Sequence, residues 1–187
     1  MDKHYYLISQ LPMLFFDQIS FMTVESFLKE AEKWLSSRDS ERLSKIDINA
    51  TSLEKRGQRV WREYQAFEFR FRSALAAWRK SLREGEEIKP DFPLSMVKEG
   101  NPLEVEKKLL RWRWDFIEEM EREHHFDLEF LILYFLKLQI LHRLSQFRKE
   151  RGMEKFHKVV SDVLLRAKSE KGTSDAKDKR IEDEVQT

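Results

Sequence analysis

Two Glu-x-x-His spacings are the feature of this sequence whose residue types come closest to a reactive site. Glu121 precedes His124 by three residues, and Glu154 precedes His157 by three residues. Side chains at this spacing lie on the same face of a helix. Two such pairs, completed by two further glutamates, form the carboxylate-bridged di-metal site of some helical bundles. A di-metal helical-bundle enzyme is therefore one hypothesis for this chain.

The places of these residues along the predicted helices favour a simpler interpretation. In ferritin-like bundles each pair projects inward from a helix of the bundle, whereas His124 is expected at a helix end and Glu154 in a first turn. With 34 acidic residues and five histidines, the spacing also arises easily by chance. His124, His125 and Asp127 offer ligands for a single metal ion, but the helix dipole already favours histidine at a C-terminal helix end. We therefore expect solvated or capping side chains, with no metal and no cofactor.

Two segments alternate or interleave arginines with aromatic rings, namely Phe69-Arg70-Phe71-Arg72 and Arg111-Trp112-Arg113-Trp114. Single-stranded nucleic acids are bound by surfaces of this composition. Here the neighbouring acidic residues cancel the charge, and 35 Lys and Arg against 34 Asp and Glu leave a net charge of +1. On a helix such arginines extend toward water beside a buried aromatic stripe. We therefore expect no nucleic-acid partner.

The usual fingerprints of enzymes are missing from the sequence. It contains no G-x-G-x-x-G, P-loop, G-x-S-x-G or H-E-x-x-H motif, and five glycines are too few for a phosphate-binding loop. It also has no cysteine, which excludes a disulfide scaffold, a thiolate metal site and a cysteine nucleophile. We therefore predict a protein that is not an enzyme.

Composition and spacing predict an all-α fold. The 187 residues suffice for one domain, and 14 Phe, 5 Trp and 4 Tyr provide a large aromatic core. Five Gly and four Pro are too few for the turns of a many-stranded sheet. Apolar residues recur at helical spacing behind Thr23, with Glu25 in the first turn. The expected architecture is a helical bundle of about five helices.

The longest predicted helix spans residues 52–84. Thr51 and Glu54 fit a capping box at its start, and Gly85 suits its end. At 1.5 Å per residue this helix is about 50 Å long, which exceeds a compact core. Part of its apolar stripe is therefore expected to stay exposed and to bind a partner. The predicted partner-binding residues are Tyr64, Phe67, Phe71 and Trp78 on this stripe, with Arg111, Trp112 and Trp114 as a second group.

Residues 86–100, with Pro90 and Pro93, are predicted to link two halves of the chain. Asn101, Pro102 and Glu104 then combine an N-cap, a first-turn proline and a capping-box glutamate, which predicts that a helix begins here. A second helix is expected behind Asp127, over residues 128–150. Its apolar residues on all sides make it the buried central helix. The predicted organisation is a single helical domain over 1–168, with halves 1–85 and 101–168, and a disordered charged tail over 169–187.

Neither a signal peptide nor a membrane span is predicted. The first residues lack a basic region followed by an apolar run. The most apolar stretch, residues 126–141, is too short and too charged to cross a bilayer. A cytoplasmic protein is therefore expected.

Several stretches at the two ends of the predicted domain resemble an uncharacterised bacterial family. Its genes lie within operons for V/A-type ATPases, at the place where other organisms encode the C-type subunit of the enzyme. These stretches are Tyr5-Tyr6-Leu7-Ile8-Ser9-Gln10-Leu11-Pro12, Asn101-Pro102-Leu103-Glu104, Arg111-Trp112, His125-Phe126-Asp127-Leu128 and Leu138-Gln139-Ile140-Leu141. The long predicted helix over 52–84 shares with this family its general character but no specific run of residues.

The resemblance implies a shorter counterpart of the C-type subunit of V-type ATP synthases, an all-helical socket that seats the central rotor stalk on the membrane ring. Because that socket is three-lobed and about twice the size of this domain, the chain is expected either to occupy the same site or to assist assembly. The implied partners are stalk or ring subunits, and the implied location is peripheral to the inner membrane through the complex. No catalytic residue is implied.

Overall fold

The structure, a computed structural model, describes residues 3–18, 20–53, 57–86, 89–147, 153 and 159–161. All regular elements among them are helices, so the fold is all-α, as predicted. The chain divides into two compact units, residues 1–145 and 146–187. The predicted tail and most of residues 148–168 lie outside the described residues, so the single domain over 1–168 stays a prediction. The helices are α1 (Lys3–Gln10), α2 (Val24–Trp34), α3 (Ser37–Ser44), α4 (Arg59–Glu84), α5 (Ser95–Lys98), α6 (Pro102–Glu121) and α7 (Leu128–Gln146).

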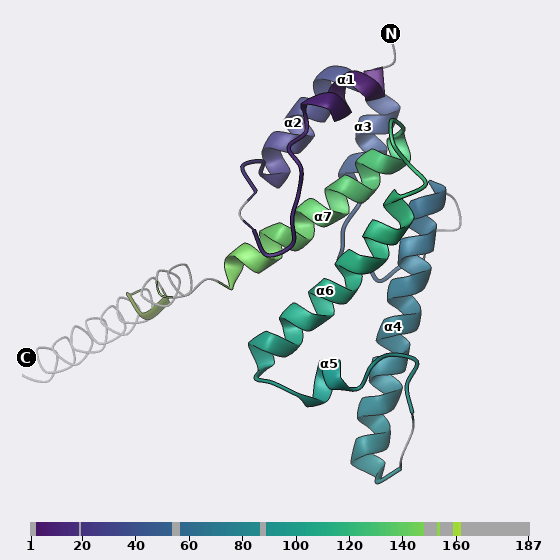
Figure 1. Ribbon diagram of the computed structural model, residues 1–187, viewed down its shortest axis with the longest axis vertical. Coiled ribbons are helices and arrows are strands. Elements are labelled where there is room, and N and C mark those ends of the chain that lie inside the picture. Colours follow the sequence, from purple (N-terminus) through teal and green to yellow (C-terminus); the bar gives the residue numbers. More distant parts are fainter. Residues whose placement is uncertain are drawn as a thin grey trace, which may run out of the picture. The chain divides into compact units, whose positions relative to one another are not determined.

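Helix α7 forms the centre of the first unit. All side chains from Leu131 to Leu138 are buried. On one side Phe135 stacks on Phe27 of α2, with ring centroids 5.3 Å apart. On the other side Lys137 lies over the ring of Trp114 in α6. Figure 1 accordingly shows α7 between α1, α2 and α3 and the pair formed by α4 and α6. The prediction of a buried central helix is confirmed over residues 128–146.

Capping boxes start α2 and α6 at the predicted residues. The Thr23 hydroxyl accepts a hydrogen bond from the Ser26 N–H at 3.1 Å, and the Ser26 hydroxyl accepts one from the Thr23 N–H at 2.9 Å. At α6 the Asn101 side chain accepts from the Glu104 N–H at 3.0 Å, and Glu104 accepts from the Asn101 N–H at 3.2 Å. Pro102 occupies the first turn. Both starts are fixed by residues within one turn of the chain.

The long helix α4 begins at Arg59, so the predicted start at residue 52 is wrong. Residues 51–53 are irregular, and Glu54 lies outside the described residues. Gly57 explains the later start, because glycine costs about 1 kcal/mol in a helix interior. The observed 26 residues correspond to a length of about 39 Å. The predicted end is confirmed, since Gly85 follows in the left-handed conformation with φ of 74°.

Residues 86–100 do more than link two halves. Phe92 is buried, and its ring packs edge-on against Phe71 and Trp78 of α4 with centroids 5.6 and 6.4 Å away. The neighbouring apolar side chains that join this cluster are Leu94, Met96 and Val97. This segment therefore covers apolar side chains on the C-terminal half of α4.

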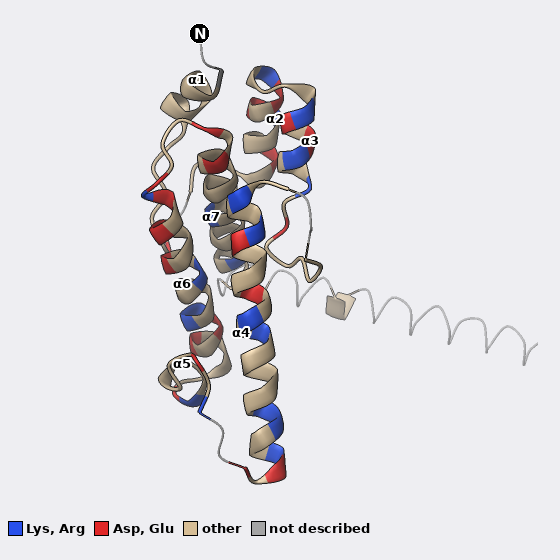
Figure 2. Ribbon diagram, turned by 90° about the vertical axis from the view of Figure 1, so that its right-hand side faces the viewer, with Lys and Arg blue, Asp and Glu red and all other residues tan. Residues whose placement is uncertain are grey.

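Charged side chains are spread over the helices. Figure 2 shows basic and acidic residues interspersed along α4 and α6. Within the part of the chain that the structure describes, every helix is too short or too polar to cross a membrane.

Candidate functional site

Most of the predicted partner-binding residues belong to the core. Tyr64, Phe71, Trp78 and Trp114 expose 1%, 5%, 8% and 1% of their surface. The expectation that part of the stripe on α4 stays exposed is therefore wrong for Tyr64, Phe71 and Trp78. These side chains are covered because α6 and residues 92–97 pack against the apolar side of α4. These four side chains are not accessible to a partner.

The other three predicted residues are more accessible. Phe67 is half-buried and stacks on Phe116 of α6, with centroids 4.0 Å apart. Trp112 is half-buried beside the cluster around Phe92. Arg111 is exposed and forms an ion pair with Asp115 at 2.7 Å. Of the seven residues, Arg111 is the one that lies on the surface.

The segment between α1 and α2, residues 11–22 and here called the apolar loop, presents large apolar side chains to solvent. Phe21 and Met13 expose 97% and 79% of their surface, and Phe15 exposes 52%. In Figure 1 this dark purple segment runs from α1 along α7 before the chain enters α2. Sequence reasoning missed this surface. The available signal was an aromatic-rich stretch over 11–22 with one acidic residue and no Lys or Arg.

Contacts to α6 and α7 hold the apolar loop at Pro12, Phe16 and Asp17. The Tyr134 hydroxyl donates a hydrogen bond to the Pro12 carbonyl at 2.9 Å. Phe16 packs edge-on against Trp114, with ring centroids 5.6 Å apart. Asp17 forms an ion pair with Lys107 at 3.3 Å. The exposed side chains are therefore presented by a segment that is fixed at several points.

A charged cluster lies inside the contact between α4 and α6. Glu68, with only 3% of its side chain exposed, accepts two hydrogen bonds from Arg113 at 2.9 and 2.8 Å and one from Arg72 at 2.6 Å. Burial acts to lower the pKa of Arg113, but the hydrogen bonds and the charge of Glu68 outweigh it and raise that pKa. The arginines expected to extend to water thus include one that is buried and paired. This cluster joins two helices and serves packing.

The first Glu-x-x-His pair is split between two partners. Glu121 binds the buried Lys137 of α7, whereas His124 turns toward the start of α7. The second pair, Glu154 and His157, lies outside the described residues. The di-metal hypothesis therefore gains no support from the part of the site that is described.

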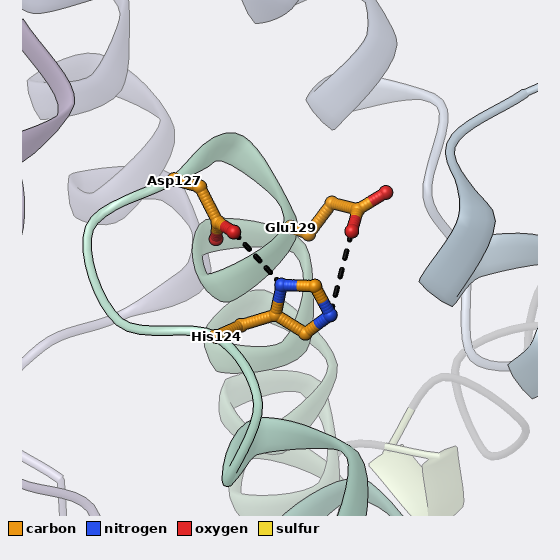
Figure 3. A group of neighbouring side chains, drawn as sticks. All are labelled: His124, Asp127 and Glu129. Carbon is orange, nitrogen blue, oxygen red and sulfur yellow. Dashed lines mark hydrogen bonds and ion pairs between the residues drawn. The ribbon is translucent and has the colours of Figure 1, made fainter.

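His124 is enclosed by two carboxylates at the turn between α6 and α7 (Figure 3). Its Nδ1 atom lies 2.8 Å from Asp127 Oδ2, and its Nε2 atom lies 3.4 Å from Glu129 Oε2. Asp127 also caps α7, as predicted, because its Oδ1 atom accepts a hydrogen bond from the Phe130 N–H at 2.7 Å. The second Glu129 oxygen accepts from the Arg59 N–H at 3.1 Å. The turn between α6 and α7 is thereby tied to the start of α4.

This cluster differs in membership from the group that the sequence suggested. His125 is exposed and stands outside it, while Glu129 takes its place. His124, Asp127 and Glu129 each offer a ligand atom, and these atoms lie within 4.8 Å of one another. An imidazole with a carboxylate at each nitrogen either donates to both as an imidazolium or keeps one nitrogen as an acceptor.

The fold and this surface define an all-α protein with a fixed, exposed apolar loop. Residues 85–166 match a family model described as "Protein of unknown function (DUF2764)". The match spans α5, α6 and α7, and covers less than half of the chain. No curated protein and no solved structure matches the sequence.

Proposed function

We propose that this protein is a non-catalytic subunit or accessory protein of a V/A-type rotary ATPase, which helps to seat the central stalk on the membrane ring or assists its assembly. The observation that carries the binding role is the exposure of Met13, Phe15 and Phe21 on a loop that is anchored at its base. Exposed apolar clusters of this kind on a folded protein mark interaction sites. The resemblance described above supplies the identity of the partner.

The chemistry of the apolar loop indicates what it binds. Residues 11–22 carry no basic residue, and their single acidic residue, Asp17, is paired with Lys107. A surface without free charge favours an uncharged, apolar partner surface over a strongly charged one. The apolar face of a helical stalk or ring protein fits this description, because an amphipathic helix presents such a face.

The arrangement of the resembling stretches supports the same proposal. Tyr5, in the stretch near the N-terminus, packs against Phe126 in the turn between α6 and α7, with ring centroids 4.8 Å apart. Both side chains remain about half exposed, at 54% and 51%. Two stretches more than a hundred residues apart in sequence thus form one surface.

The test is a binding titration of the full chain against purified V/A-type ATPase from the same cell. The double variant Phe15→Ser with Phe21→Ser is expected to weaken binding by about tenfold or more, since buried aromatic anchors dominate interface energies. Phe69→Ser is the matched control, because Phe69 on α4 is exposed to the same extent as Phe15, at 54% against 52%. This control is expected to bind like the wild type.

Two results would overturn the proposal. The first is a wild-type chain that does not bind the ATPase or any of its stalk and ring subunits. The second is equal weakening by the loop variant and by Phe69→Ser, which would show that surface apolarity in general, and not the loop, causes the binding. Thermal melts of all variants verify that each remains folded.

A further inference from the structure

The His124 ring is oriented as in metal sites. Asp127 Oδ2 lies 2.8 Å from Nδ1, and the other Asp127 oxygen is fixed by the Phe130 N–H. Histidines that bind metals almost always donate their other ring N–H to a carboxylate or carbonyl, which fixes the ring and raises its basicity. Asp127 therefore occupies the position of an outer partner, and Nε2 is the atom that the ring offers to a ligand.

The distance between His124 Nε2 and Glu129 Oε2 is that expected between two neighbouring ligand atoms of a metal ion. The two atoms are 3.4 Å apart, which is beyond the usual range of about 2.7–3.2 Å for an N–H···O hydrogen bond. In a tetrahedral zinc site, bond lengths of about 2.0–2.2 Å place neighbouring nitrogen and oxygen ligands about 3.3–3.5 Å apart. The separation of the two atoms therefore matches that of two neighbouring ligands of one ion.

Glu129 is supported as ligating carboxylates usually are. Its second oxygen accepts a hydrogen bond from the Arg59 N–H at 3.1 Å, so one oxygen is held by α4 while the other faces His124. The His124 and Glu129 side chains expose 12% and 21% of their surface, and Asp127 exposes 48%. Solvent thus reaches the cluster, and water can complete the coordination. One imidazole with a carboxylate suits Zn²⁺, Co²⁺ or Ni²⁺, whereas Mg²⁺ and Ca²⁺ prefer oxygen ligands alone.

We propose that the turn between α6 and α7 binds one divalent transition-metal ion, such as Zn²⁺, through His124 Nε2 and Glu129 Oε2, with Asp127 orienting the imidazole. The site is independent of the proposed ATPase role and of the apolar loop. It also differs from the di-metal hypothesis, because it uses Glu129 in place of Glu121 and needs neither Glu154 nor His157. The ion would bridge the turn, through His124, and the first turn of α7, through Glu129, whose other oxygen is held by the Arg59 N–H.

The experiment uses the full chain, freed of affinity tags and stripped with EDTA. Zn²⁺ and Co²⁺ are titrated by calorimetry, and the Co²⁺ complex is followed by visible absorption. We expect one ion per chain, a tetrahedral Co²⁺ spectrum and a higher melting temperature with Zn²⁺. His124→Gln and Glu129→Gln are expected to weaken binding at least tenfold, and Asp127→Asn by about 10–100-fold, the usual effect of losing an outer partner.

His125→Gln is the matched control, since His125 is the neighbouring histidine but is exposed and outside the cluster. It is expected to leave the affinity unchanged. Glu129→Gln keeps an oxygen for the Arg59 N–H, so this variant is expected to remain folded. Thermal melts in EDTA check the folding separately from metal binding. The proposal is overturned if the wild type binds no ion at millimolar concentration, or if His125→Gln weakens binding as much as His124→Gln. If His124→Gln lowers the melting temperature while metal has no effect on the wild type, the cluster is held by ionic contacts alone. This result also overturns the proposal.

Discussion

Two buried tyrosines differ in what their hydroxyl groups reach. Tyr134 donates a hydrogen bond to the Pro12 carbonyl, whereas the Tyr64 hydroxyl has no hydrogen-bond partner among the described residues. Burial raises the pKa of both tyrosines above the ordinary value, and the charges of Glu68 near Tyr64 and Glu121 near Tyr134 add to this effect. Both hydroxyl groups therefore stay neutral, and only one of them contributes a bond.

This difference predicts opposite effects of removing the two hydroxyl groups. Tyr134→Phe is expected to lower the free energy of unfolding by about 1 kcal/mol, because a hydrogen bond to the apolar loop is lost. Tyr64→Phe is expected to leave it unchanged or to raise it, since a buried polar group without a partner costs about 1–3 kcal/mol. Urea unfolding of both variants measures this. A larger loss for Tyr64→Phe than for Tyr134→Phe would contradict the assignment.

Among the helices, the contact between α4 and α6 combines aromatic stacking with a buried ion cluster. Glu68 of α4 is held by Arg113 of α6 through two hydrogen bonds. The Arg113 side chain is 13% exposed, and the Arg72 side chain is 36% exposed. Loss of one partner is expected to destabilise the buried Glu68–Arg113 pair more than the Glu68–Arg72 pair, because water cannot replace the missing partner there.

Arg113→Ala is therefore expected to lower the free energy of unfolding by about 3–5 kcal/mol, since it leaves the Glu68 carboxylate buried with less compensation. Arg72→Ala is expected to cost less, because that side chain is nearer to water. The double variant Glu68→Leu with Arg113→Met is expected to recover much of the loss by removing both charges. Denaturant unfolding of these variants measures the differences. A double variant as unstable as Arg113→Ala alone would show that packing, and not charge, causes the loss.

For the chain as a whole, composition predicts that the last residues add little to stability. Residues 169–187 contain four Lys and Arg, six Asp and Glu and very few apolar side chains. They lie outside the described residues, so this remains a prediction from composition. Truncation after Lys168 is expected to leave the melting temperature nearly unchanged, because little apolar surface is available for burial. A fall of many degrees in a thermal melt would show that this segment packs on the rest of the chain.

Several features that depend only on neighbouring residues were predictable from the sequence, although the capping box expected at Thr51 and Glu54 did not mark the start of α4. The caps at Thr23 and Asn101 and the helix end at Gly85 each act within one turn, so their types and spacing were sufficient. The burial of α7 followed from apolar residues on all its sides. The same signals were enough to establish the all-α class.

Contacts between distant segments were not predictable in this way. The aromatic stripe of α4 has the same pattern whether it meets a partner or its own chain, and only the return of Phe92 and α6 showed that Trp78 and Tyr64 are core residues. The exposure of Phe21 and the meeting of His124 with Glu129 likewise depend on where separate segments come to rest. The physical reason is that periodicity indicates which side of a helix is apolar, while contacts between residues distant in sequence decide what covers that side.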